Sequence, residues 1–310
     1  MSEGSGESIA DIQAAAPPHS QAERVRGDLF LLAAALVWGS SFVAGRLAAG
    51  SLGPFFYNGA RFTLGALVLL PFLFRKLRGF TRKEMWAGLL AGVIVCGAVN
   101  TQQIGIEFTT AGKAGFITGL YVVFVPLLSA LILRRPPRVL VWVATVLATG
   151  GLFLLSVQRN FRFGAGDGWV LIAAILFAMH VLLLERFAPR VDVLRLAFVQ
   201  HLSCGLLSLF LSPFLEHTSL TGLGSGWWTI AYNGALSVGL AFTFQVVGQR
   251  HAPAFDAALL MSLESVFAAV FGWLLLSESL SPQQIAGCVL ILGAMVIAQI
   301  RSSTRSTSDS

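Results

Sequence analysis

Ten apolar segments, each of about twenty residues, constrain the fold of this chain more than any other feature of its sequence. A helix that crosses the roughly 30 Å hydrocarbon core of a bilayer needs about 20 mainly apolar residues. An isolated strand would leave its backbone groups without hydrogen bonds in lipid, so helices are the expected structure. The sequence predicts ten membrane-spanning helices, at Leu29–Ala49, Pro54–Phe74, Met85–Phe108, Gly112–Leu133, Val139–Val157, Gly168–Phe187, Leu194–Phe214, Trp227–Gly248, Pro253–Leu276 and Pro282–Ile300.

The few charged residues lie mainly in the short links between these segments. Only 12% of the 310 residues are charged, against about 25% in soluble domains. The net charge of +6 forms no basic stripe with interleaved aromatic residues, so we expect no nucleic-acid partner. Of the 21 Lys and Arg residues, sixteen fall on one side of the predicted membrane and three, Lys113, Arg159 and Arg162, on the other. Because positive charge accumulates in cytoplasmic loops, we expect both termini in the cytoplasm of a multi-pass protein of the cell (inner or plasma) membrane.

The second half of the chain repeats the first. Gln102 and Gln245 lie 143 residues apart, and several other residues recur in the same order at that spacing. Each half has five predicted spans, an odd number, so the second half must run in the opposite sense across the membrane. The predicted fold class is therefore an all-α membrane protein whose ten transmembrane helices form two inverted five-helix repeats.

The predicted organisation has four parts. Residues 1–27 form a disordered cytoplasmic N-terminal segment, and residues 301–310 form a disordered cytoplasmic tail. Between them lie a first five-helix repeat at residues 28–158 and a second, inverted repeat at residues 167–300. Inverted repeats are common in secondary transporters, where the solute site lies between the halves.

Several short motifs are shared with a known family. They are Ala60-Arg61-Phe62 in the second span, Pro126 in the fourth, and Glu278, Ser281 and Gly287 around the ninth and tenth. With the five-plus-five arrangement, they resemble the EamA-type family of the drug/metabolite transporter superfamily over about Leu29 to Ile300. The resemblance implies an exporter or permease for amino acids or related metabolites in the inner membrane.

Each half departs from that pattern at one position. Arg135 stands where the family pattern has an acidic residue at the end of the fourth span, and Ala269 stands where the first half has Pro126. Both departures leave the predicted fold intact and leave the substrate open.

Charged and titratable residues inside spans are the first candidates for the solute pathway, because such groups are costly in hydrocarbon. Arg61 binds a substrate carboxylate, gates the outer side by pairing, or is a structural cation satisfied by backbone carbonyl groups or by a glutamate such as Glu107. Glu264 is the proton-coupling candidate, with binding of a substrate amino group and a packing role as alternatives. His180 and His201 lie near mid-depth and are either proton carriers or hydrogen-bonded packing residues.

Uncharged residues complete the set of candidates. Trp38, Tyr121 and Tyr232 are candidates for an aromatic wall, and Gln103 and Gln245 for hydrogen bonds to the solute. Their alternative role is to join helices. Pro126 removes a backbone hydrogen bond from the fourth span and is either a hinge or a fixed bend.

These features favour a secondary transporter that moves a small metabolite by alternating access and possible proton coupling; an intramembrane enzyme or a channel is the alternative. The sequence contains no G-x-x-x-x-G-K-[ST] loop for ATP and no motif of a catalytic serine or metal site. We therefore expect no enzyme activity, no cofactor and no metal. The expected partners are a small-molecule substrate, the lipid bilayer and protons, with the chain a monomer or a weak homodimer.

Overall fold

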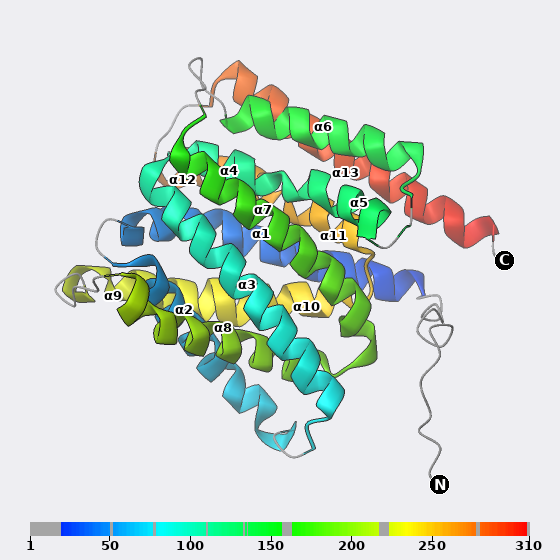
Figure 1. Cartoon of the computed structure of the whole chain (residues 1–310). Coiled ribbons are helices and arrows are strands. Elements are labelled where there is room, and N and C mark those ends of the chain that lie inside the picture. The colour runs from blue at the N-terminus through cyan, green and yellow to red at the C-terminus, as the bar shows by residue number, and fades with distance from the viewer. Residues whose placement is uncertain are drawn as a thin grey trace, which may run out of the picture.

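A computed structural model of the chain describes residues 20–49, 52–76, 79–109, 111–132, 134, 136–156, 163–216, 223–276 and 280–308. Every regular element in these residues is helical (Figure 1). The first repeat contains α1 (Gln21–Ala49), α2 (Pro54–Leu73), η2 (Phe74–Lys76), α3 (Arg82–Phe108), α4 (Ala111–Gly119), α5 (Tyr121–Ile132) and α6 (Val139–Ser156). The second contains α7 (Ala165–Phe187), η3 (Ala188–Arg190), α8 (Val193–Leu215), α9 (Leu223–Tyr232), η5 (Asn233–Phe242), α10 (Thr243–Gln249), α11 (Ala254–Met261), α12 (Glu264–Leu276) and α13 (Pro282–Ser308).

The ten predicted spans are all helical, which confirms the fold class. Among the described residues, eight helical stretches are long and apolar enough to cross a membrane, and they match the second to ninth predicted spans. The first predicted span lies within α1, and the tenth lies within α13, whose apolar part is Pro282–Ile297. The eighth span changes its winding along its length, because η5 is a π-helix between the α-helices α9 and α10.

The ends of the first and last helices lie beyond the predicted spans. The helix α1 begins at Gln21 because Ser20 and Glu23 form a reciprocal cap: the Ser20 amide donates to the Glu23 carboxylate, and the Glu23 amide donates to the Ser20 hydroxyl. The helix α13 continues to Ser308, through most of the polar tail. Residues 1–19 of the expected N-terminal segment, and Glu278 of the family motif, lie outside the described residues.

The two repeats are interleaved, and equivalent helices pack against each other. The second spans of the two halves, α2 and α8, lie side by side, as do the fifth spans, α6 and α13 (Figure 1). The third span, α3, packs against α7 and α8 of the other half. Contact between equivalent elements is expected around an axis that relates two halves, and it leaves the remaining spans to surround a central space.

A pair of glycines sets the distance between α6 and α13. A Cβ atom added to Gly151 would lie 2.6 Å from the carbonyl oxygen of Gly287, and one added to Gly287 would lie 2.6 Å from that of Gly151. The two backbones therefore touch directly, which only residues without a side chain permit.

The fourth and ninth spans are both broken, at equivalent positions. Between α4 and α5, the amide of Leu120 donates to the carbonyl of Ile117 at 3.2 Å. Between α11 and α12, 143 residues later, the amide of Leu263 donates to the carbonyl of Leu260 at the same distance. In each repeat this hydrogen bond runs from residue i to residue i−3 instead of i−4, which interrupts the α-helix. The break is therefore a property of the repeat. It was not predicted from the sequence.

Pro126, the predicted hinge, lies inside α5, downstream of the break at Leu120. Its counterpart in α12 is Ala269, and that helix is broken at the same place without a proline. Proline is therefore not required for the interruption of these two spans.

Ion pairs join η2 and α3 of the first repeat to the start of α8 in the second. Lys76 Nζ lies 2.6 Å from Asp192 Oδ2, and Arg195 Nη1 lies 3.2 Å from Glu84 Oε2. Burial disfavours the charged Asp192 carboxylate, but hydrogen bonds from Lys76 and from the Arg195 and Leu194 amides outweigh it and lower the pKa of Asp192. These contacts tie the two repeats together at one face of the bundle.

Candidate functional site

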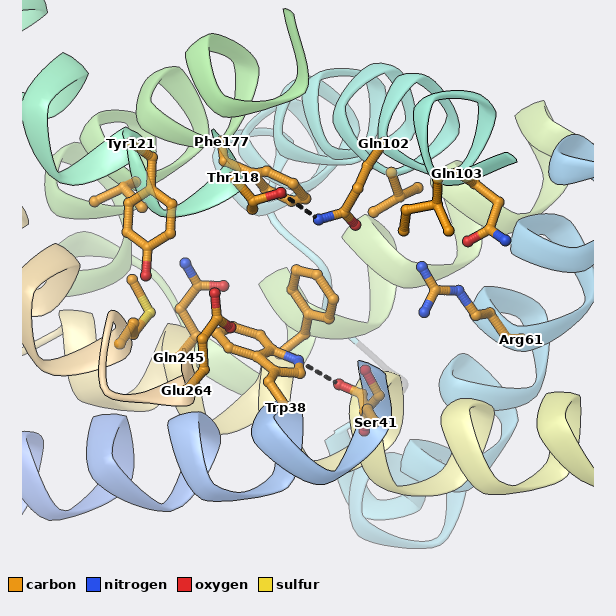
Figure 2. A pocket seen from close by; sticks show the side chains of 16 residues that line it. Trp38, Ser41, Arg61, Gln102, Gln103, Thr118, Tyr121, Phe177, Gln245 and Glu264 are labelled. Carbon is orange, nitrogen blue, oxygen red and sulfur yellow. Dashed lines mark hydrogen bonds between the residues drawn. The ribbon is translucent and has the colours of Figure 1, made fainter. Parts of the chain in front are cut away.

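A pocket lies between the two repeats and contains about 780 Å³ of space not filled by protein atoms, part of it open to solvent (Figure 2). Helices from both halves line it: α1 and α3 to α5 from the first, and α7, η5 and α10 to α12 from the second, with one residue, Arg61, from α2.

Most of the lining consists of residues that occupy equivalent positions in the two repeats. One pair, at the first and sixth spans, is separated by 139 residues, and four pairs in the third, fourth, eighth and ninth spans are separated by 143. The pairs are Trp38 with Phe177, Val99 with Phe242, Gln102 with Gln245, Thr118 with Met261, and Tyr121 with Glu264. The pocket therefore lies on the axis that relates the repeats, where a shared solute site is expected.

One pair of equivalent positions in the pocket differs in chemical character, because one residue is a tyrosine and the other a glutamate. Tyr121 is the first residue of α5 and Glu264 is the first residue of α12, so the breaks in the two spans place both at the pocket wall. They lie close enough to interact electrostatically. One repeat thus supplies a neutral phenol where the other supplies a carboxyl group.

The Glu264 side chain has no partner of its own. The residue is only 6% exposed, and within the described part of the chain no hydrogen bond or ion pair involves its carboxyl group. A buried acid is costly unless it is paired, and the Glu264 carboxyl group lines the pocket without such a pair.

Arg61 projects into the pocket at the end opposite Tyr121 (Figure 2). The residue is 9% exposed, and its guanidinium carbon lies 5.1 Å from the centre of the Tyr57 ring and 5.4 Å from that of Phe62. Its Nε donates to Asn58 Oδ1 at 2.8 Å. No carboxylate among the described residues pairs with it, and Glu107, the predicted structural partner, is exposed at the end of α3.

Aromatic and amide side chains form the rest of the wall. Trp38 donates from Nε1 to the carbonyl of Ser237 at 3.2 Å, and its ring meets the edge of Phe242, with centroids 4.9 Å apart. Gln102 donates to the Thr118 hydroxyl at 2.9 Å.

Six of the nine predicted pathway residues line this pocket. They are Trp38, Arg61, Gln103, Tyr121, Gln245 and Glu264. The other three, His180, His201 and Tyr232, are not part of its lining.

His180 and His201 are fully buried behind Phe242, whose ring contacts both imidazoles at 6.3 and 6.2 Å between centroids. His180 Nε2 is hydrogen-bonded to Gln200 Oε1 at 2.8 Å. Tyr232 is hydrogen-bonded to the Ser40 hydroxyl at 2.7 Å and joins α9 to α1.

Several lining residues were not predicted, and most of them are apolar or small: Ser41, Val99, Ile106, Thr118, Phe177, Val181, Ser237, Phe242 and Met261. A signal for one of them was present in the sequence, because Phe177 is the repeat equivalent of the candidate Trp38. Val99 with Phe242, and Thr118 with Met261, are equivalent pairs in which neither residue was a candidate.

Within the described residues, no three His, Cys, Asp or Glu side chains converge as metal ligands. Among the described residues that line the pocket are one carboxyl group, one guanidinium, four aromatic side chains and three glutamines.

Comparison with known proteins identifies the family. The EamA-like transporter family matches the chain twice, over residues 25–157 and 164–299. A solved structure, described only as the crystal structure of a protein, superposes with a TM-score of 0.75 at 20% identity, covering 90% of this chain and 98% of that one. At this identity the likeness shows the fold.

Relatives over most of the length are named as transporters. An uncharacterized transporter of Archaeoglobus fulgidus is 32% identical over 90% of this chain and 87% of its own length. The uncharacterized transporter YoaV of Bacillus subtilis is 25% identical over 85% and 93%. An S-adenosylmethionine/S-adenosylhomocysteine transporter of Chlamydia muridarum is 26% identical over 85% and 87%. The chain is a multi-pass membrane protein that belongs to the EamA-like transporter family.

Proposed function

We propose that this chain is a secondary transporter that moves a small metabolite of the amino-acid class across the inner or plasma membrane by alternating access, with protons coupled through Glu264. The observation that carries the proposal is the presence of an unpaired carboxyl group, Glu264, and an accessible guanidinium, Arg61, in one pocket between inverted repeats. A molecule with an ammonium and a carboxylate group complements both.

The charge pattern explains why a carboxyl group would couple two flows. Glu264 accommodates one positive charge at a time, either a proton or the ammonium group of a substrate. A carrier that binds them alternately exchanges protons for substrate, and with an inward proton gradient it exports the substrate.

The similarity to a transporter of S-adenosylmethionine and S-adenosylhomocysteine supports the same substrate class. Both compounds end in an α-amino-acid group, and both carry a purine that would stack on aromatic side chains. Trp38 and Phe177 supply such rings in the pocket.

The orientation in the membrane is part of the proposal. The excess of Lys and Arg in alternate links supports cytoplasmic termini. Epitope tags at the N-terminus and at residue 160 that reported the same side of the membrane would contradict this topology.

The proposal is tested by reconstituting the purified protein in liposomes and following labelled amino acids and S-adenosylmethionine, with and without a pH gradient. We expect saturable counterflow that the gradient accelerates. Glu264→Gln is expected to abolish the effect of the gradient, whereas Glu107→Gln, a matched change outside the pocket, leaves it intact.

Other outcomes favour other functions. Flux that does not saturate and shows no counterflow would indicate a channel, and conversion of a substrate without flux would indicate an enzyme. Gradient-driven flux that is unchanged in the Glu264→Gln protein would remove Glu264 as the coupling residue.

A further inference from the structure

The Arg61 side chain is held by a chain of buried hydrogen bonds that begins two helices away. Asn58, one turn before Arg61 on α2, accepts from Arg61 Nε through Oδ1 at 2.8 Å. Asn58 Nδ2 donates to the carbonyl of Val99 and to Asn100 Oδ1, both at 3.0 Å. Asn100 Nδ2 in turn donates to Ser208 Oγ on α8 at 2.8 Å.

This chain of bonds fixes which way each amide faces. Both hydrogens of Asn58 Nδ2 are used on α3, so its oxygen must face Arg61. If the amide were reversed, an NH₂ group would meet the guanidinium and two acceptors would lose their donors. Asn58, Asn100 and Ser208 are 0%, 3% and 0% exposed, so water does not replace these bonds.

The rings of Tyr57 and Phe62 fix the remaining freedom of the guanidinium. Its carbon lies within 5.1 Å of one ring centre and 5.4 Å of the other. With Nε bound to Asn58, the two terminal nitrogens are the donors left. Tyr57 also interacts with the guanidinium, but no carboxylate among the described residues pairs with it. Figure 2 shows the guanidinium directed into the pocket.

A buried arginine with this support is a site for a planar anion. The terminal nitrogens present two parallel N–H groups, which match the two oxygens of a carboxylate. The carboxyl group of Glu264 occupies a different part of the pocket and does not pair with Arg61 (Figure 2). Among the described residues of the second half, none that lines the pocket is an arginine, so the guanidinium stands on one side of the pocket and would orient the solute.

We propose that Asn58 and Asn100 are positioning residues that aim Arg61 as the carboxylate-binding group of the pocket, so that the transported solute is selected for a free carboxylate. This inference rests on the proposed transport function. It assigns to the network a role in choosing between an acid and its amide, which a role in packing alone would not have.

The experiment measures counterflow of labelled amino acids in liposomes and its inhibition by the unlabelled amino acids and by their carboxamides. We expect the wild-type protein to bind an amino acid at least roughly tenfold more tightly than the carboxamide, because one charge-assisted pair is at stake. Asn58→Leu is expected to reduce that preference about tenfold and to leave carboxamide affinity within about twofold.

Two further substitutions test the charge at position 58 and the outermost hydrogen bond of the chain. Asn58→Asp retains an oxygen that accepts from Arg61, but it loses both hydrogen bonds that Nδ2 donates to α3, and its charge competes with the substrate carboxylate. We expect the preference for the acid to fall to about one. Ser208→Ala removes the outermost bond of the chain and a hydrogen bond with Cys96 Sγ at little cost in volume. It is expected to reduce the preference about two- to threefold.

Thr145→Val is the matched control, because Thr145 is 3% exposed, donates to a carbonyl in its own helix α6, and does not line the pocket. We expect it to keep the wild-type preference. Equal affinity of the wild-type protein for acid and amide would overturn carboxylate selection while leaving transport intact. An unchanged preference in Asn58→Asp and Ser208→Ala would overturn the positioning role, and absence of any counterflow would overturn the proposed function itself.

Discussion

The contact between α6 and α13 predicts opposite effects for the same substitution at two neighbouring residues. Gly151→Ala places a Cβ atom 2.6 Å from the Gly287 carbonyl oxygen, 2.7 Å from Ile291 Cγ1 and 3.0 Å from the Ile291 amide nitrogen. Two of these three atoms are backbone, so the overlap is relieved only if the two helices move apart.

The expected magnitude follows from two opposing terms. Overpacking of a close contact costs about 1–3 kcal/mol, and replacing glycine by alanine inside a helix returns roughly 0.5–1 kcal/mol. Gly151→Ala should therefore lower the free energy of unfolding by about 1–2 kcal/mol. Gly150→Ala meets no atom within 4 Å, so only the favourable term applies and the stability should rise by up to about 1 kcal/mol.

The assay is unfolding of the purified protein in mixed micelles by increasing SDS, followed by tryptophan fluorescence. Gly293→Ala, at the position equivalent to Gly150 and also without a neighbour within 4 Å, is a second control. Gly287→Ala should resemble Gly151→Ala, and the double substitution should cost less than the sum, because the first has already separated the helices. Equal stability of the Gly150→Ala and Gly151→Ala proteins would refute the close contact.

Two further predictions concern the links between the repeats and the broken span. Because the pKa of Asp192 is lowered, its ionised form stabilises the fold above the ordinary carboxyl pKa of about 3.9, and this contribution is lost as the pH falls through the folded-state value. Thermal melting between pH 6 and 3 should therefore show a smaller acid-induced loss of stability for Asp192→Asn than for the wild type. An equal loss of stability would contradict the assignment. Pro126→Ala should leave the interruption at Leu120 in place, because the second repeat has the same interruption without a proline. Distances between spin labels on α4 and α5 should be unchanged. Longer distances, as in one straight helix, would show that the proline causes the break.

The sequence by itself determined the elements, their number and their relation. Lipid offers no hydrogen bonds to the backbone, so about twenty consecutive apolar residues become a helix whatever their neighbours are. The spacing of Gln102 and Gln245, and of the residues that recur with them, indicates the repeat, and five spans in each half make it inverted. Arg61 and Glu264 could be chosen as pocket candidates because a charged residue inside a span is energetically costly and is usually functional.

Only the tertiary structure decided which faces of these helices meet. A span that is apolar all round carries no record of its rotation, so His180 and Trp38 looked alike as pathway candidates; packing buries the first and turns the second into the pocket. Arg61 and Asn58 lie one turn apart on α2, but the amide orientation that lets Asn58 accept from Arg61 depends on the acceptors that α3 supplies. Rotation is set by close contacts such as that of Gly151 with Gly287, which join residues far apart in the chain and leave no local pattern in it.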